Sequence, residues 1–210
     1  MLRVKDESRT IHDTLTNLTY LCDYIVGLDN GSTDGTEEIW KYYPKVIHLE
    51  KMAGYDEGRD IRLLYKIITE QFKPEWVIYL AGDEVLDTNR ETLDALITEG
   101  YAGFAFPVCH FWKNKLGYRI DGRWKASSLS QMRMWQVQGQ ERFSDKTYDI
   151  GLPMDLKGLV KHTEIKLLHY GYIFPDTIRR KHRRYIERFG GQVDYSHLLD
   201  EKGLEIVPFP

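Results

Sequence analysis

The chain has 210 residues, 42% of them hydrophobic, and a formal net charge of −3. This length suits one compact domain with a substantial core, and the slightly negative charge argues against a dedicated nucleic-acid-binding protein. Two cysteines make no disulfide framework, so a reducing compartment, the cytoplasm, is expected. No apolar run approaches the ~20 residues that span a bilayer, so no transmembrane segment is expected.

The first half of the chain alternates short apolar runs with helical patterns. Strands are predicted at residues 2–5, 24–29, 45–49 and 76–86. Helices are predicted at residues 8–22, 33–42 and 61–72, the last ending before Pro74. This order predicts a mainly parallel, doubly wound sheet with right-handed crossovers.

The second half, from residue 101, is richer in aromatic residues. Strand-like segments at 102–112, 118–124 and 131–137 are separated by Gly, Asn and Ser, which predicts antiparallel additions to the sheet. Further along, loops with one short helix are expected at 138–161, a late strand at 165–172 and a basic helix at 177–189. The tail at 204–210 is expected either to be loosely held or to continue into further domains.

The most informative stretch is residues 24–36. An apolar run ends in Asp29, turn formers follow, and residues 37–40 are helix-like. In open α/β sheets ligands bind outside the carboxyl ends of the strands, so Asp29 is expected to face a ligand crevice.

Two ordered motifs resemble the GT-A glycosyltransferases of the family-2 type. The sequence DNGSTDGT at 29–36 is similar to the family signature DDGSTDGT, and WVIYLAGDEVL at 76–86 is similar to its metal-binding strand. The resemblance is good over residues 2–86 and loose beyond them. It implies an α/β, Rossmann-like three-layer sandwich in one domain, with a nucleotide-binding half (1–100) and an acceptor-side half (101–210). It also implies a UDP-sugar donor, Mn²⁺ or Mg²⁺ as cofactor, and a hydroxyl acceptor on a glycan or glycoconjugate.

The resemblance assigns nucleotide contacts to several residues. A carboxylate at Asp29 can accept the N3–H of uracil, which cytosine lacks, or it can simply cap the turn. The neighbouring Asp34 is expected to order the turn or cap the helix. Lys5, Asp6 and Glu7 resemble a segment that lines the nucleoside, although charges at a strand end are often only solvated. Arg59 matches a family arginine that can reach a diphosphate, or it can pair with a local Asp.

The metal motif of this chain is incomplete. The family's Asp-x-Asp reads Ala81-Gly82-Asp83 here, so Gly82 and Asp83 are assigned to the nucleotide and Asp83 to the metal, because hard oxygen ligands suit Mg²⁺ and Mn²⁺. His169 is predicted as the second metal ligand, although a single His in an apolar strand is often structural. Glu84, next along the strand, is expected to point away and orient its neighbours.

Other candidates are less specific. His110 and His162 are weaker metal candidates. In the basic run 179–185, Lys181 and Tyr185 match a Lys-x-x-x-Tyr segment of the family, and the resemblance assigns Lys181 to the nucleotide. The run can also be a solvated helix face, or bind lipid or nucleic acid. The aromatic residues Trp112, Trp124 and Trp135 are expected to divide between core and sugar platform.

An inverting mechanism requires a carboxylate base for the acceptor hydroxyl. The candidates are Asp155, then Asp149 and Asp145, and the apolar neighbours of Asp155 are expected to raise its pKa. A retaining mechanism needs no such base. Two other functions remain open: a nucleotide-sugar-binding module without transfer activity, and a sugar nucleotidyltransferase, which usually has a glycine-rich loop that residues 2–10 lack.

Overall fold

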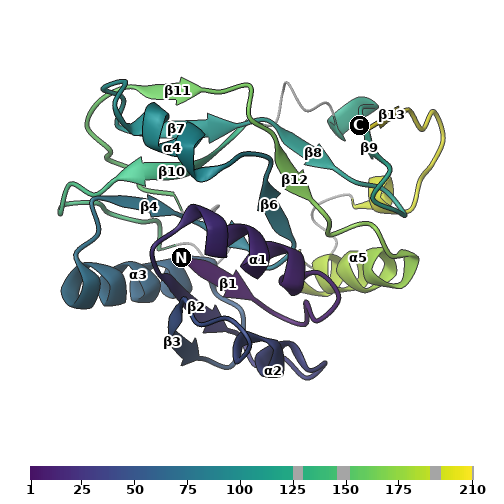
Figure 1. Cartoon of the computed structure of the whole chain (residues 1–210). Helices are drawn as coiled ribbons and strands as arrows, with labels where there is room; N and C mark the ends of the chain where they lie inside the picture. Colours follow the sequence, from purple (N-terminus) through teal and green to yellow (C-terminus); the bar gives the residue numbers. More distant parts are fainter. Residues whose placement is uncertain (125–129, 146–151, 190–194, 210) are drawn as a thin grey trace.

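The computed structural model describes residues 1–124, 130–145, 152–189 and 195–209. Four strands form a parallel central sheet in the order β3-β2-β1-β5, of which β1, β2 and β3 are labelled in Figure 1. The strands are β1 (Leu2–Val4), β2 (Ile25–Asp29), β3 (Val46–Lys51) and β5 (Leu80–Ala81). All five residues of β2 are buried, as expected of a parallel strand that is covered on both faces.

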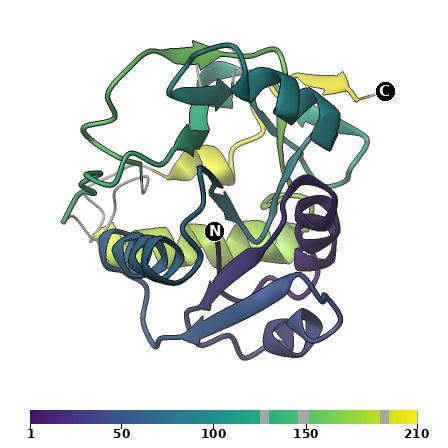
Figure 2. The same cartoon turned by 60° about the vertical axis from the view of Figure 1, so that its left-hand side comes forward.

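Helices cover both faces of this sheet. They are α1 (Ile11–Leu21), α2 (Thr36–Trp40) and α3 (Glu57–Ile67), which continues into a π-helical turn, Ile68–Phe72. Figure 2 shows α1 and α2 on one side of the strands and α3 on the other. The predicted three-layer arrangement is therefore confirmed.

The alternation of side chains along β1 and β2 separates two cores. Leu2 and Val4 pack in the core on the α1 side, together with Ile25. Val26 and Leu28 pack in the core on the α3 side. Because successive strand residues point to opposite faces, Arg3 is directed toward α3, where it meets acidic partners described below.

Three further sheets are formed mainly by the second half of the chain. The first has the order β11-β7-β10-β4 and the second the order β6-β12-β8, while β13 pairs with β9. Their strands are β4 (Trp76–Ile78), β6 (Glu84–Leu86), β7 (Gly103–Phe106), β8 (Val108–His110), β9 (Gly117–Arg119), β10 (Gln131–Gln136), β11 (Val160–His162), β12 (Leu167–His169) and β13 (Ile206–Pro208). The helical elements are α4 (Arg90–Ile97), α5 (Pro175–Phe189) and two short 3₁₀ turns, Gly122–Trp124 and Ser196–Leu198. The predicted antiparallel pairing is confirmed where β10 runs beside β4 and β7, and β12 beside β6. These strands lie in separate sheets rather than in the central one, and β11 with β7 and β12 with β8 pair in parallel.

The predicted strand at 76–86 is wrong in its continuity. The chain forms β4, crosses into the parallel sheet as β5, turns at residues 82–83 and leaves as β6. Glycine allows this turn to lie against β1, because a Cβ at Gly82 would be 2.6 Å from Val4 Cγ1. A side chain at position 82 would therefore displace the turn.

Other local predictions also differ from the structure. Residues 118–124 are a strand only to Arg119, and a 3₁₀ turn follows from Gly122, which has a φ of 48°. Within 138–161 the described residues contain no helix and instead form β11 and an isolated bridge between Phe143 and Pro153. The tail is not loose, because β13 pairs with β9 and the Phe209 amide donates to the Leu116 carbonyl at 2.8 Å. The Phe143–Pro153 bridge and the pairing of β13 with β9 have no local sequence signal, because the paired residues are separated along the chain.

Helix α4 was not predicted. Asn89 caps its N-terminus, since the side chain accepts a hydrogen bond from the Thr92 amide at 2.9 Å, and Leu93 and Leu96 of the helix are buried. No helix of the described residues is long and apolar enough to cross a lipid bilayer.

The close contact of α2 with β2 gives a test of the packing. A Cβ at Gly27 would lie 2.3 Å from the buried ring of Trp40. We expect Gly27→Ala to lower the free energy of unfolding by about 1–3 kcal/mol, measured by urea denaturation, because the core must shift to admit a methyl group. The double variant Gly27→Ala/Trp40→Leu should cost less than the sum of the two single variants. Wild-type stability of Gly27→Ala would contradict this packing.

Candidate active site

The carboxyl ends of β1, β2 and β5 meet at one edge of the central sheet. The register pairs Val4 with Asp29 and Arg3 with Ala81, so the loops that follow these strands emerge side by side. Lys5 joins two of them, because its ammonium donates to the carbonyls of Asn30 (3.1 Å) and Gly31 (2.6 Å). The sequence predicted a ligand edge here, and the structure brings its residues together.

Asp6 holds the same two loops together. It has a φ of 53°, a conformation that Asp and Asn adopt more readily than most residues. Its amide donates to Ser32 Oγ at 2.9 Å, and its Oδ1 accepts from the Thr33 amide at 2.8 Å. In this structure Lys5 and Asp6 therefore shape the loop, and their contact with a nucleoside stays a prediction.

Asp29 is 2% exposed at the end of β2. Its Oδ1 accepts from the Ser32 amide at 2.6 Å, whereas its buried Oδ2 has no hydrogen-bond partner among the described residues. One oxygen thus caps the turn, and the other can accept a hydrogen bond from a ligand. A buried acceptor left without a donor costs free energy, which such a ligand would restore.

Asp34 has the structural role that the sequence indicated. Its Oδ1 accepts from the Thr36 amide at the start of α2, and its Oδ2 accepts from the Ser8 amide, both at 3.0 Å. Burial alone would raise the pKa of Asp34, but these hydrogen bonds lower it below its ordinary value.

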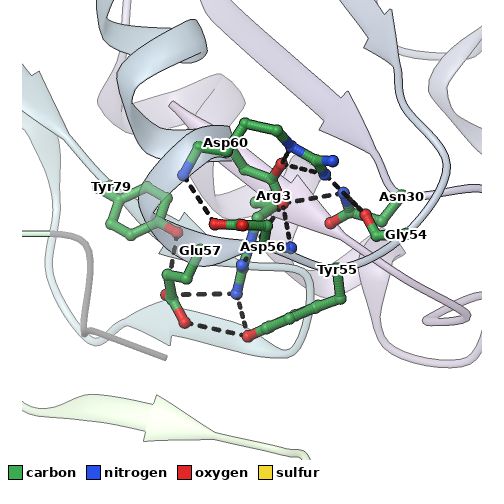
Figure 3. A network of polar contacts seen from close by, with 9 residues as sticks. Arg3, Asn30, Gly54, Tyr55, Asp56, Glu57, Asp60 and Tyr79 are labelled. Atoms are coloured by element: carbon green, nitrogen blue, oxygen red, sulfur yellow. Dashed lines mark hydrogen bonds and ion pairs between the residues drawn. The ribbon is translucent and has the colours of Figure 1, made fainter. Parts of the chain in front are cut away.

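A buried polar network connects the edge to α3 (Figure 3). The guanidinium of Arg3 donates to the Tyr55 hydroxyl and lies 3.2 Å from Glu57 Oε1 and 3.7 Å from Asp60 Oδ2. Asp60 also accepts from Asn30 Nδ2 at 2.9 Å. Asn30, the residue after Asp29, is therefore connected through Asp60 of α3 to Arg3 of β1.

Arg59 follows the alternative considered from the sequence. Its Nε donates to Asp60 Oδ1 at 2.8 Å, and its Nη2 donates to the Gly54 carbonyl at 2.8 Å. The side chain is 37% exposed. Contact with a diphosphate stays a prediction for this residue.

The turn between β5 and β6 is held by Glu84. Its Oε2 accepts from the Ala81 amide at 2.9 Å, and its Oε1 accepts from Arg133 Nη2 of β10 at 2.8 Å. The prediction that Glu84 points away from Asp83 and orients its neighbours is confirmed. This buried pair fixes the backbone on which Asp83 stands.

Asp83 is the centre of a buried cluster. Its Oδ2 lies 2.5 Å from the ammonium of Lys181 on α5 and 3.4 Å from His169 Nε2 at the end of β12. A second histidine, His110 at the end of β8, extends the cluster, with 2.8 Å between the Nδ1 atoms of the two rings. The ammonium also lies 3.9 Å from Glu7 Oε1. Lys181 is 4% exposed, so the interpretation of its position as a solvated helix face is wrong.

Strand pairing explains why these residues meet. His169 is opposite Glu84 in the antiparallel pair with β6 and beside His110 in the parallel pair with β8. The prediction that Asp83 and His169 lie at one site is confirmed by their contact, whereas His110 was predicted only as a weaker candidate. The signal available for His110 was its position at the end of an apolar strand, as for His169.

Charge dominates the cluster. Burial would raise the pKa of Asp83, but Lys181 first, and then His169, hold it well below its ordinary value. Burial would lower the pKa of Lys181, but Asp83 and Glu7 hold it above its ordinary value. Burial, with the charge of Asp83, raises the pKa of Glu7 to about 7. Asp83 and Lys181 therefore form a charged pair in the protein interior.

The predicted Mn²⁺ or Mg²⁺ site does not fit this arrangement. Position 81 offers no carboxylate, and the described residues contain no group of three or more His, Cys, Asp and Glu side chains placed to hold a metal ion. The ammonium of Lys181 already shares Asp83 Oδ2 at 2.5 Å, and a divalent cation bound about 2.1 Å from that oxygen would lie against a like charge. His162 stands apart on β11, where it pairs with Ala105. A requirement for a cation stays a prediction.

The predicted rise in the pKa of Asp155, the first candidate for the general base, is wrong. Asp155 accepts from the amide and from Nε of Arg142, both at 2.8 Å, and these hydrogen bonds lower the pKa of Asp155 rather than raise it. Asp145 is exposed and pairs with Arg62 at 2.9 Å. Asp149 lies outside the described residues.

The three tryptophans are core residues. Trp112, Trp124 and Trp135 are all buried, so an exposed sugar platform on any of them is wrong. Trp124 and Tyr172 nevertheless pack against the His110 ring, with centroids 5.0 and 5.8 Å away. They form an apolar wall beside the histidine pair.

Comparison with known proteins supports the fold. No family model matches the sequence, and comparison with curated proteins gives no match. Among solved structures, S. aureus TarS is similar, with a TM-score of 0.54 and 13% identity over 94% of this chain and 41% of that chain. TarS 1-349 in complex with UDP has a TM-score of 0.52 and 14% identity, over 94% of this chain and 67% of that one. The complex with UDP-GlcNAc gives 0.53 and 14%, over 94% and 68%.

This likeness confirms the fold class predicted from the sequence. The chain has a GT-A-like fold, with a parallel central sheet flanked by helices as in TarS. It spans less than half the length of the longer TarS chain, for which the shared part is 41%.

The Glu84–Arg133 pair gives a test of how the Asp83 turn is held. We expect Arg133→Met to lower the free energy of unfolding by about 3–5 kcal/mol in urea denaturation, because it leaves a buried carboxylate unpaired. The double variant Arg133→Met/Glu84→Gln should recover part of this loss, since no charge remains. A loss below about 1 kcal/mol in the single variant would show that the pair does not hold the turn.

Proposed function

We propose that this chain is a glycosyltransferase that moves a hexose or deoxyhexose from a UDP-sugar to a hydroxyl of a glycan or glycoconjugate. The observation that carries the proposal is the buried carboxylate of Asp29, with one oxygen lacking a partner among the described residues, at the carboxyl end of β2. Its setting supports the proposal, because the fold resembles that of TarS, which has been solved in complex with UDP and with UDP-GlcNAc.

Base recognition follows from hydrogen-bond chemistry. Uracil has an N–H donor at N3 between two carbonyl acceptors, and a carboxylate can only accept. Asp29 Oδ2 would accept a hydrogen bond from this N3–H group, whereas N3 of cytosine carries no hydrogen. A site built on this contact discriminates by leaving a buried acceptor unpaired when the wrong base enters.

In the proposed reaction the acceptor oxygen forms a bond to the anomeric carbon of the donor. The bond from that carbon to the diphosphate oxygen breaks, and its electron pair remains on the departing UDP. The acceptor hydroxyl loses its proton to a base or to water. Asp149 stays a predicted base for an inverting reaction, while the pairing of Asp155 with Arg142 makes Asp155 a weaker candidate.

A nucleotide-sugar-binding module without transfer activity is the second candidate. Ala81 favours it, because the carboxylate that relatives carry at this position is missing. The two functions differ in one product: a transferase releases UDP when donor and acceptor are both present, and a binding module does not. A UDP-release assay over a panel of UDP-sugars and glycan acceptors separates them.

The proposal predicts selective stabilisation by uracil nucleotides. We expect UDP to raise the melting temperature of the protein more than CDP or GDP does, because all three carry the same diphosphate and differ in the base. A ligand at a hundredfold excess over Kd adds about 2.7 kcal/mol of stability, which a melting curve resolves. Asp29→Asn should remove this selectivity. Asparagine can keep the oxygen that accepts from Ser32 while it replaces the second acceptor by an N–H₂ donor.

Asp23→Asn is the matched control, because Asp23 is exposed and pairs with Arg90 rather than with the loops at the edge. It should retain the wild-type response to UDP. Equal melting shifts with all three nucleotides in the wild-type protein would refute uracil recognition by this site.

A further inference from the structure

Lys181 reaches Asp83 across a glycine that makes room for it. A Cβ at Gly171 would lie 2.2 Å from the Lys181 ammonium and 2.6 Å from Asp83 Oδ2. A side chain at position 171 would therefore displace the ammonium, the carboxylate or both. The backbone after β12 is shaped so that a lysine on α5 can bond a carboxylate on the β5–β6 turn.

Burial of this lysine is costly unless its charge is matched. An ammonium taken from water into the interior loses its hydration. Its attraction to Asp83 at 2.5 Å and Glu7 at 3.9 Å offsets part of that free-energy cost. Among the described residues the ammonium donates one hydrogen bond, to Asp83. An ammonium has three N–H donors, so it can bond a further oxygen without leaving Asp83.

The position of the pair makes it relevant to the donor. Asp83 directly follows β5, and Glu7 belongs to the loop after β1, so Lys181 lies at the edge where the loops after the parallel strands meet. Two other cations of α5 approach the same edge. Arg180 Nη2 donates to the Asp6 carbonyl at 2.9 Å, and the Arg184 guanidinium carbon lies 5.9 Å from the centroid of the Tyr55 ring.

We propose that Lys181, held by Asp83, supplies the positive charge that binds the diphosphate of the donor, in place of a divalent cation. This inference rests on the proposed function. Asp83 is then a positioning residue for an ammonium and not a metal ligand. A divalent cation at this position would stabilise negative charge on the departing diphosphate. A fixed ammonium in a site of low dielectric constant can stabilise the same charge.

Two observations favour this assignment over a divalent cation. The first carboxylate of the metal motif is absent at Ala81, so the chain offers one carboxylate where two are usual. The remaining carboxylate already has a buried cation hydrogen-bonded to the oxygen that also faces His169.

The test compares UDP with uridine, measured by calorimetry in EDTA and in Mn²⁺. In the wild-type protein UDP should bind in EDTA, and Mn²⁺ should change its Kd by less than about threefold. Lys181→Met should weaken UDP binding at least about tenfold and leave uridine binding unchanged, because only UDP carries the diphosphate. Lys181→Arg, which keeps the charge, should retain part of the UDP affinity.

Lys161→Met is the matched control, because Lys161 pairs with Glu99 away from the cluster, and it should bind both ligands as the wild-type protein does. Circular dichroism shows whether Lys181→Met is folded; if it is not, the wild-type comparison in EDTA and the Lys181→Arg variant decide. UDP binding that requires Mn²⁺, or an unchanged UDP affinity in folded Lys181→Met, overturns the inference alone. Failure of the wild-type protein to bind UDP under either condition overturns the proposed function as well.

Discussion

The parallel register of β1 between β2 and β5 is the constraint on which the site depends. It aligns Val4 with Asp29 and Arg3 with Ala81, so the loops that follow three strands emerge together. A slip of one residue would turn Arg3 into the apolar core beside α1 and Leu2 toward the acidic side chains of α3. The same register therefore decides both the two cores and the position of the candidate ligand edge.

Three buried charged groups connect this edge to distant parts of the chain. Arg3 links β1 to the acidic residues of α3, Arg133 links β10 to the turn after β5, and Lys181 links α5 to the same turn. Buried ion pairs add little stability compared with apolar packing of equal volume, because both charges lose their hydration. We therefore interpret these pairs as positioning devices. Each holds a segment of the edge in one place relative to the sheet.

The two halves of the chain contribute differently to the site. Residues before 87 supply the buried carboxylate Asp29 and the turn that carries Asp83. The later half supplies His110, His169 and Lys181, which surround Asp83 from β8, β12 and α5. The Asp29 motif is thus local in sequence, while the electrostatic environment of Asp83 is assembled from distant segments, since Lys181 lies 98 residues from Asp83 and His169 lies 59 residues from His110.

By itself, the sequence determined the alternation of strands and helices in the first half, the parallel sheet, and the position of Asp29 at a strand end, whereas it placed Asp83 within a continuous strand rather than in a turn. These features depend on hydrophobic periodicity and turn chemistry, which act over a few residues. Only the tertiary structure decided that β13 pairs with β9, that Lys181 is buried, and that it bonds Asp83 across Gly171. It also decided that Asp155 pairs with Arg142, which reverses the expected direction of its pKa. Such contacts depend on which distant surfaces meet, and a basic helix has the same sequence pattern whether its lysine faces water or a buried carboxylate.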